Sequence, residues 1–192
     1  MLHPFTNCIY ACLFVIAPAA MAADEVKFDY RVLSTTKTST MEKEMNEAAE
    51  AGFSFSSAMG GQTAVGGKEV VVVMAKDDKA APSGKRVYKL LATSKTSTMQ
   101  KEMQVLGDEG FEYKDQTVFE TGFAGREVVV IMERTETGEP GRIQYRLLST
   151  SKTSTMQKEL REAGEAGFVL VGLTVAKTSF GGSELVSILK KK

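Results

Sequence analysis

The five-residue stretch KTSTM occurs three times and holds the best candidates for ligand binding. Each copy lies where polar sequence meets an amphipathic pattern, so each is expected at a helix start. A helix N-terminus presents free amides and a partial positive charge, and lysine and hydroxyl side chains add further donors. The combination predicts a site for a small anion such as phosphate, sulfate or a carboxylate. The candidate ligand-binding residues are Lys37, Thr38, Ser39, Thr40, Lys95, Thr96, Ser97, Thr98, Lys152, Thr153, Ser154 and Thr155.

The same stretch also fits a purely structural role as a helix cap. The serines at 39, 97 and 154 each precede a Glu or Gln by three residues, the pattern of a capping box. In this interpretation the serine caps the helix and the methionine, as at Met41, begins its buried stripe. Capping does not account for the lysine and both threonines in every copy, so the two interpretations stay open.

The N-terminus has the pattern of a signal peptide. The apolar run from Ile9 to Ala17 is followed by Ala20-Met21-Ala22, a cleavage pattern. The run is shorter than the roughly 20 residues of a transmembrane helix. We expect residues 1–22 to be removed and the chain to be periplasmic or secreted. No Lys or Arg precedes the apolar run, so an uncleaved anchor is the alternative.

Cleavage there would remove several kinds of chemistry from the mature chain. His3, Cys8 and Cys12 all lie in the leader, and the chain has no other His or Cys. That excludes a disulfide framework, a zinc site of the Cys/His type and a His-based triad. The 24 basic and 24 acidic residues cancel, which disfavours nucleic acid as a partner. We expect no metal, no cofactor and no stable membrane insertion after cleavage.

The chain is a threefold repeat. Tyr30, Tyr88 and Tyr145 begin three copies, 58 and 57 residues apart, which align without a gap for about 40 residues. The predicted organisation is a signal peptide at 1–22, repeat 1 at 26–76, a linker at 77–86, repeat 2 at 87–134, a linker at 135–142 and repeat 3 at 143–190. Both linkers contain Pro and Gly.

Each repeat predicts the order strand, helix, strand, strand. Apolar residues recur at steps of four and three from Met41 to Ala48, which places one helix face in a core. The helix ends at a C′ glycine (Gly52, Gly110 or Gly167), and the following Phe is expected to pack back on it. Glycines then mark a hairpin between the last two strands. The fold class is therefore α+β, with three tandem βαββ repeats.

A repeat of about 50 residues is marginally stable alone, so the repeats are expected to pack together. The third strand, VVVVM in repeat 1, is apolar on both faces, which predicts that a sister repeat covers the face away from the helix. In repeat 3 the second strand, from Phe168 to Val171, is also apolar on both faces, which predicts a further neighbour there. We expect a compact pseudo-threefold body.

The sequences EAGFSF, DEGFEY and EAGFVLVGLT resemble the signature of a family of small uncharacterised bacterial domains. That signature is of the type Glu-Gly-Trp-Glu-Leu-Val and ends a helix, with Phe here in place of Trp. The resemblance implies the strand-helix-strand-strand fold. It implies no activity and no site residue.

These features predict an exported, non-enzymatic binding or assembly protein of the bacterial envelope. Its partner would be a small anion or an envelope protein, and a composite anion site would require the three KTSTM stretches to converge. The alternative is an enzyme or enzyme inhibitor with an unrecognised Glu/Lys/Ser site. Its best location is repeat 2, which departs from the other copies at Ala92, Tyr113, Lys114 and Asp115. Separately, the glutamates at 44, 102 and 159, one in each repeat, could pair with neighbouring carboxylates as acid and base or could be a solvated flank of their helices.

Overall fold

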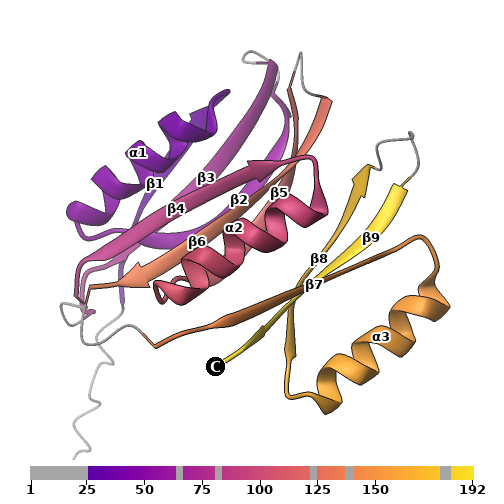
Figure 1. Ribbon diagram of the computed structural model, residues 1–192. Coiled ribbons are helices and arrows are strands. Elements are labelled where there is room, and N and C mark those ends of the chain that lie inside the picture. Colours follow the sequence, from indigo (N-terminus) through magenta and orange to yellow (C-terminus); the bar gives the residue numbers. More distant parts are fainter. Residues whose placement is uncertain (1–25, 64–66, 81–83, 122–124, 137–140, 178–182) are drawn as a thin grey trace, which may run out of the picture.

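The computed structural model describes residues 26–63, 67–80, 84–121, 125–136, 141–177 and 183–192, and it confirms three βαββ repeats (Figure 1). The predicted signal peptide and most of the predicted hairpin glycines lie outside these residues. Repeat 1 contains β1 (Phe28–Thr35), α1 (Thr38–Glu50), β2 (Ser54–Thr63) and β3 (Gly67–Asp77). Repeat 2 contains β4 (Arg86–Thr93), α2 (Thr96–Asp108), β5 (Glu112–Thr121) and β6 (Gly125–Thr135). Repeat 3 contains β7 (Gln144–Thr150), α3 (Thr153–Glu165), β8 (Val169–Lys177) and β9 (Ser183–Lys191).

Each repeat forms a three-stranded antiparallel sheet with its last strand in the centre. The orders are β1-β3-β2 (sheet 1), β4-β6-β5 (sheet 2) and β7-β9-β8 (sheet 3). The last two strands form the predicted hairpin, and the helix carries the chain from the first strand to the far edge. The second strand of every sheet has a bulge near its start, between Phe55 and Ser57 in β2. The bulges in β5 and β8 lie at the corresponding place.

The predicted helix ends are confirmed. Gly52 has φ of +89°, a conformation that glycine adopts without steric cost. The Gly52 amide donates to the Ala49 carbonyl (2.9 Å) and the Phe53 amide donates to the Ala48 carbonyl (3.0 Å), which is the Schellman motif. In each repeat a cation from the last strand also reaches the helix end, as Lys76 Nζ does to the Ala51 carbonyl (3.0 Å), and this complements the helix dipole.

The predicted capping box is wrong. The N-cap residues are the lysines Lys37, Lys95 and Lys152, whose side chains make no capping hydrogen bond with the described residues, and Ser39 is the second residue of its helix. The hydroxyl that shapes the turn comes earlier, because Thr35 Oγ1 accepts from the Lys37 amide (3.2 Å). Thr93 and Thr150 do the same in their repeats. The Glu42 side chain, assigned to the cap, bonds to the next repeat instead.

Sheets and helices alternate in layers, so that each of the first two helices is shared by two sheets. Met41 and Met45 of α1 pack against Val72 of sheet 1 and, on the other side, against Tyr88 and Ile131 of sheet 2. Helix α2 lies in the same way between sheets 2 and 3. The prediction that a sister repeat covers the outer sheet face is therefore confirmed for sheets 2 and 3. The cluster under α3 is much smaller, consisting of Leu148, Ala163 and Leu189 with two half-buried neighbours.

The principal contacts between repeats run from repeat 1 to repeat 2 and from repeat 2 to repeat 3. Figure 1 shows the three repeats following one another, with α3 at one end. A pseudo-threefold body would also need repeat 3 packed on repeat 1, and that arrangement is not shown. Among the described residues, no helix has the length and apolar character needed to cross a membrane.

Candidate functional site

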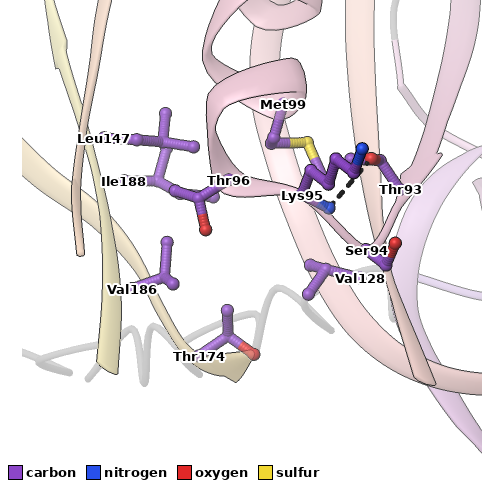
Figure 2. Close-up of a pocket in the computed structure, with 10 residues that line it drawn as sticks. All are labelled: Thr93, Ser94, Lys95, Thr96, Met99, Val128, Leu147, Thr174, Val186 and Ile188. Atoms are coloured by element: carbon purple, nitrogen blue, oxygen red, sulfur yellow. Dashed lines mark hydrogen bonds between the residues drawn. The ribbon is translucent and has the colours of Figure 1, made fainter. Parts of the chain in front are cut away.

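The three KTSTM stretches lie at the starts of three separate helices. Their lysines and serines are exposed, and Thr38 and Thr96 are half-buried. The second stretch borders a crevice of about 20 Å³ between α2 and sheet 3, whose lining includes Lys95, Thr96 and Met99 together with Val186 and Ile188 (Figure 2). That volume is enough for one water molecule, and the crevice is lined by residues of one KTSTM stretch only. Two wider grooves in the described part, of about 610 and 540 Å³, contain none of the twelve candidate residues.

Polar side chains of the motif-bearing helices converge instead on the next repeat. Glu42 Oε2 accepts from the Leu90 amide (2.9 Å), and Glu42 Oε1 lies 2.9 Å from Lys89 Nζ. One turn later, Asn46 accepts from the Tyr88 amide (2.9 Å) and donates to the Tyr88 carbonyl (3.0 Å). Strand β4 pairs with β6 on one edge only, so these side chains satisfy the backbone groups of its other edge.

Helix α2 repeats this contact on β7. Gln100 accepts from the Leu147 amide (2.6 Å) and donates to the Tyr145 carbonyl (2.8 Å). Gln104 accepts from the Tyr145 amide (2.9 Å) and donates to the Ile143 carbonyl (3.3 Å). An amide side chain offers both a donor and an acceptor, so two of them four residues apart complete the edge of a strand.

A third element of the contact is a tyrosine that reaches under the preceding helix. Tyr88 is fully buried, and its hydroxyl accepts from the Phe55 amide (2.9 Å) and donates to Glu133 Oε2 (2.6 Å). Tyr145 likewise accepts from the Tyr113 amide (2.7 Å) and donates to the Phe111 carbonyl (3.0 Å). The donating amides of Phe55 and Tyr113 lie beside the bulges, where the strand ladder is interrupted.

Burial sets the protonation of these tyrosines. It raises the pKa of Tyr145 to about 12. Burial raises the pKa of Tyr88 as well, and the hydrogen bond to the Glu133 carboxylate raises it further. Both hydroxyls therefore stay protonated at neutral pH and remain donors to their partners.

The residues by which repeat 2 departs from its sisters serve the same contact. Lys114 Nζ lies 2.8 Å from Glu133 Oε1, beside the Tyr88 hydroxyl. Asp115 Oδ2 accepts from the Ala58 amide of repeat 1 (3.3 Å). Ala92 packs at the edge of the core that α1 shares with sheet 2. The glutamates at 44, 102 and 159, considered above as acid and base groups, lie one on each of the three helices.

The face of sheet 1 that corresponds to these covered faces is open. Phe28, Tyr30 and Val32 project from β1 and are each more than half exposed, with Tyr30 at 60%. In repeat 3 the corresponding Tyr145 is 4% exposed and Ile143 is 3% exposed. No helix among the described residues occupies over sheet 1 the place that α1 has over sheet 2.

Repeat 3 is open in the complementary way. Gln157 and Arg161 of α3 correspond to Gln100 and Gln104, and both are exposed. The neighbour predicted for the apolar second strand of repeat 3 is present on one face only, where Val171 packs against the core that α2 shares with sheet 3. Val169 and Leu170 are exposed, as are Leu173 and Val175 farther along β8. The prediction is therefore confirmed for the face of β8 toward repeat 2 and wrong for the other face, because no described repeat follows repeat 3 to cover it.

Sequence reasoning missed the residues that build this contact. The tyrosines served to align the repeats, and Glu42 and Gln100 were assigned to a cap. A signal was available, because a tyrosine recurs at one position in every repeat and polar side chains four residues apart recur beside the apolar stripe. Comparison with family models, curated proteins and solved structures finds no match for the chain. The resemblance to the uncharacterised bacterial domains therefore stays a prediction.

Proposed function

We propose that the chain is an exported, non-enzymatic binding and assembly protein of the bacterial envelope. Its binding surface is the outer side of sheet 1, the open sheet face, formed by Phe28, Tyr30, Val32, Met59, Val71 and Val73. The export follows from the leader pattern at residues 1–22. The small-anion site at the Lys-Thr-Ser-Thr helix starts remains a separate proposal, supported by the exposed lysines and the helix N-termini.

The observation that carries this proposal is that the equivalent sheet face is buried in the other two repeats. Val71 and Val73 correspond to Val129 and Ile131 in repeat 2, which are fully buried under α1. In repeat 3 the equivalent valine and isoleucine are buried under α2. A contiguous exposed apolar face of this kind marks an interaction site.

The covered faces also indicate the chemistry of the partner. Each receives an amphipathic helix with a methionine stripe, flanked by polar side chains four residues apart that bond to the strand edge. On sheet 1 the corresponding edge groups are the Val32 amide and the backbone of Tyr30. The partner class is therefore a protein helix laid on a sheet face, held by apolar packing and by side-chain bonds to the backbone.

A helix peptide tests this binding mode directly. The probe is a fluorescent peptide of residues 95–111. Because short helices are marginally stable alone, a lactam bridge from Lys101 to a glutamate introduced as V105E holds it helical. Both bridged positions are exposed on α2. We expect saturable binding to the purified chain and its loss in Tyr30→Asp. Val105→Asp, an exposed apolar position on α2, is the matched control and should bind as wild type does. Equal binding by Tyr30→Asp would contradict the proposal.

A further inference from the structure

We propose that the partner helix is α3 of a second copy of this chain, docked head to tail on the open sheet face. This inference rests on the binding mode of the proposed function and names its occupant. Helix α1 covers sheet 2 and α2 covers sheet 3. Helix α3 is the one helix of the described chain without a following sheet, and sheet 1 is the one sheet without a preceding helix. A contact of the same kind between two copies would place α3 of one copy on sheet 1 of the other.

The exposed apolar residues lie where this arrangement needs them. Ten large apolar residues are exposed in the described part of the chain, and nine of them belong to the two ends. Val105 is the exception. Those at the sheet 1 end are Val26, Phe28, Tyr30, Val32 and Met59, and those at the repeat 3 end are Val169, Leu170, Leu173 and Val175.

The polar groups of the internal contact are also present at both ends. Gln157 corresponds to Gln100, so it would accept from the Val32 amide and donate to the Tyr30 carbonyl of the second copy. The Leu170 amide lies beside the bulge in β8, where the Phe55 and Tyr113 amides lie in their strands, so it would donate to the Tyr30 hydroxyl of the second copy.

The helix surface that must approach the strand is small in all three repeats. Ala49, Gly107 and Gly164 occupy one position, and a Cβ on Gly107 would lie 2.3 Å from the Ile143 carbonyl oxygen of β7. At Gly164 a Cβ would meet no described atom within 4 Å. That space is where a β1 strand of a second copy would lie.

Charges match across the proposed contact as well. Lys85 Nζ lies 3.3 Å from Glu50 Oε1 between repeats 1 and 2. The residues at the corresponding positions of the two open ends are Lys27 and Glu165, again a base facing an acid.

One residue departs from the internal pattern and makes the contact between copies weaker than the internal ones. Arg161 stands where repeats 1 and 2 have Asn46 and Gln104. An arginine donates but does not accept, so the Tyr30 amide would lack the acceptor that the Tyr88 and Tyr145 amides have. Replacing it by Arg161→Gln restores an acceptor and should tighten association about 2- to 10-fold, the range for one hydrogen bond.

The contact is heterologous, because two different surfaces meet, so copies would add in series rather than close as a twofold dimer. Sedimentation velocity of the purified chain should therefore show species that grow with protein concentration. Tyr30→Asp blocks the sheet end and Gly164→Arg blocks the helix end, and each should be monomeric. An equimolar mixture of the two keeps one intact contact and should form a dimer and nothing larger. Val105→Asp is the control and should associate as wild type does.

Two results would overturn this inference. If two open sheet faces met each other, Tyr30→Asp would abolish association, Gly164→Arg would have no effect, and the mixture would gain nothing. If another segment or protein occupied the face, the wild-type chain would stay monomeric at every concentration. In that second case, binding of the 95–111 helix peptide would still support the proposed function. If the chain neither associated nor bound the peptide, both the proposed function and this inference would be rejected. Circular dichroism of each variant establishes that its fold is retained.

Discussion

At the scale of single residues, three aligned tyrosines show how position in the series decides what a side chain does. Tyr88 and Tyr145 are buried and bond a bulge amide of the preceding repeat, whereas Tyr30 is 60% exposed. The residue type is the same in all three, so the difference comes from the layer that covers each one.

Removing a buried hydroxyl should therefore cost stability at one tyrosine and not at another. Tyr88→Phe leaves the Phe55 amide and a Glu133 oxygen without their partner. We expect a loss of about 1–3 kcal/mol in unfolding free energy, the cost of unsatisfied buried groups, measured by urea denaturation. Tyr30→Phe is the matched control and should change stability by less than about 0.5 kcal/mol. An equal loss in both variants would contradict this account.

The repeated lysines make a contrasting prediction. Lys37, Lys95 and Lys152 are exposed N-cap residues whose side chains make no capping bond with the described residues. The triple substitution by Ala should leave the thermal midpoint within a few degrees of wild type, because exposed substitutions change stability little. Isothermal titration with inorganic phosphate then tests the anion proposal, which requires binding by wild type and weaker binding by the triple variant. An unfolded triple variant would show that the lysines are structural.

At the scale of elements, glycines in equivalent helices should respond oppositely to one added methyl group. Gly107→Ala places Cβ 2.3 Å from the Ile143 carbonyl oxygen, so β7 must move away. We expect a loss of about 1–3 kcal/mol, the usual cost of overpacking. Gly164→Ala meets no described atom and should gain up to about 1 kcal/mol through helix propensity. Urea denaturation gives the unfolding free energy of both variants. A higher unfolding free energy in both would mean that α2 does not approach β7 so closely.

A strand-end ion cluster gives repeat 3 a pH-dependent attachment to repeat 2. Hydrogen bonding from Lys192, with the nearby charge of Lys190, holds the pKa of Glu112 below its ordinary value of 4.5. Because the folded pKa is the lower one, the stabilisation is complete above about the ordinary value and is lost as pH falls through the folded pKa. The stability difference between wild type and Glu112→Gln should therefore shrink as pH falls from 7 to 3. Glu162→Gln, which breaks an exposed pair with Lys158, should show a much smaller difference throughout.

Much of each element could be predicted from local sequence. The methionine stripe, the C′ glycines and the hairpin all depend on residues within one repeat, and the structure confirms them. The capping box failed because Glu42 has two possible partners, its own helix start and the edge of β4. Periodicity within one repeat contains no information about which partner wins, since the strand edge is 48 residues away.

At the scale of the whole molecule, the sequence does not predict the order of the layers, and so does not predict which sheet faces are covered. Apolar strands such as VVVVM predict cover on both faces, and they are covered in sheets 2 and 3. The same pattern in repeat 1 leaves Val71 and Val73 at an end of the series. A repeat array buries each face only against its neighbour, so identical residues are core in one repeat and surface in another.

This end effect predicts a gradient of local stability that hydrogen exchange can measure. Helices α2 and α3, counted from their N-cap lysines, begin with the same eight residues, KTSTMQKE, so the intrinsic exchange rates of this stretch match. Helix α2 is shared by two sheets, whereas α3 packs on one. A difference of about 1.4 kcal/mol in opening free energy is tenfold in rate, and we expect α3 amides to exchange at least about tenfold faster in dilute protein. Raising the concentration should protect α3 in wild type, where a second copy covers it, and should leave Gly164→Arg unchanged. Equal protection of α2 and α3 at every dilution would mean that a covering layer adds nothing to helix stability.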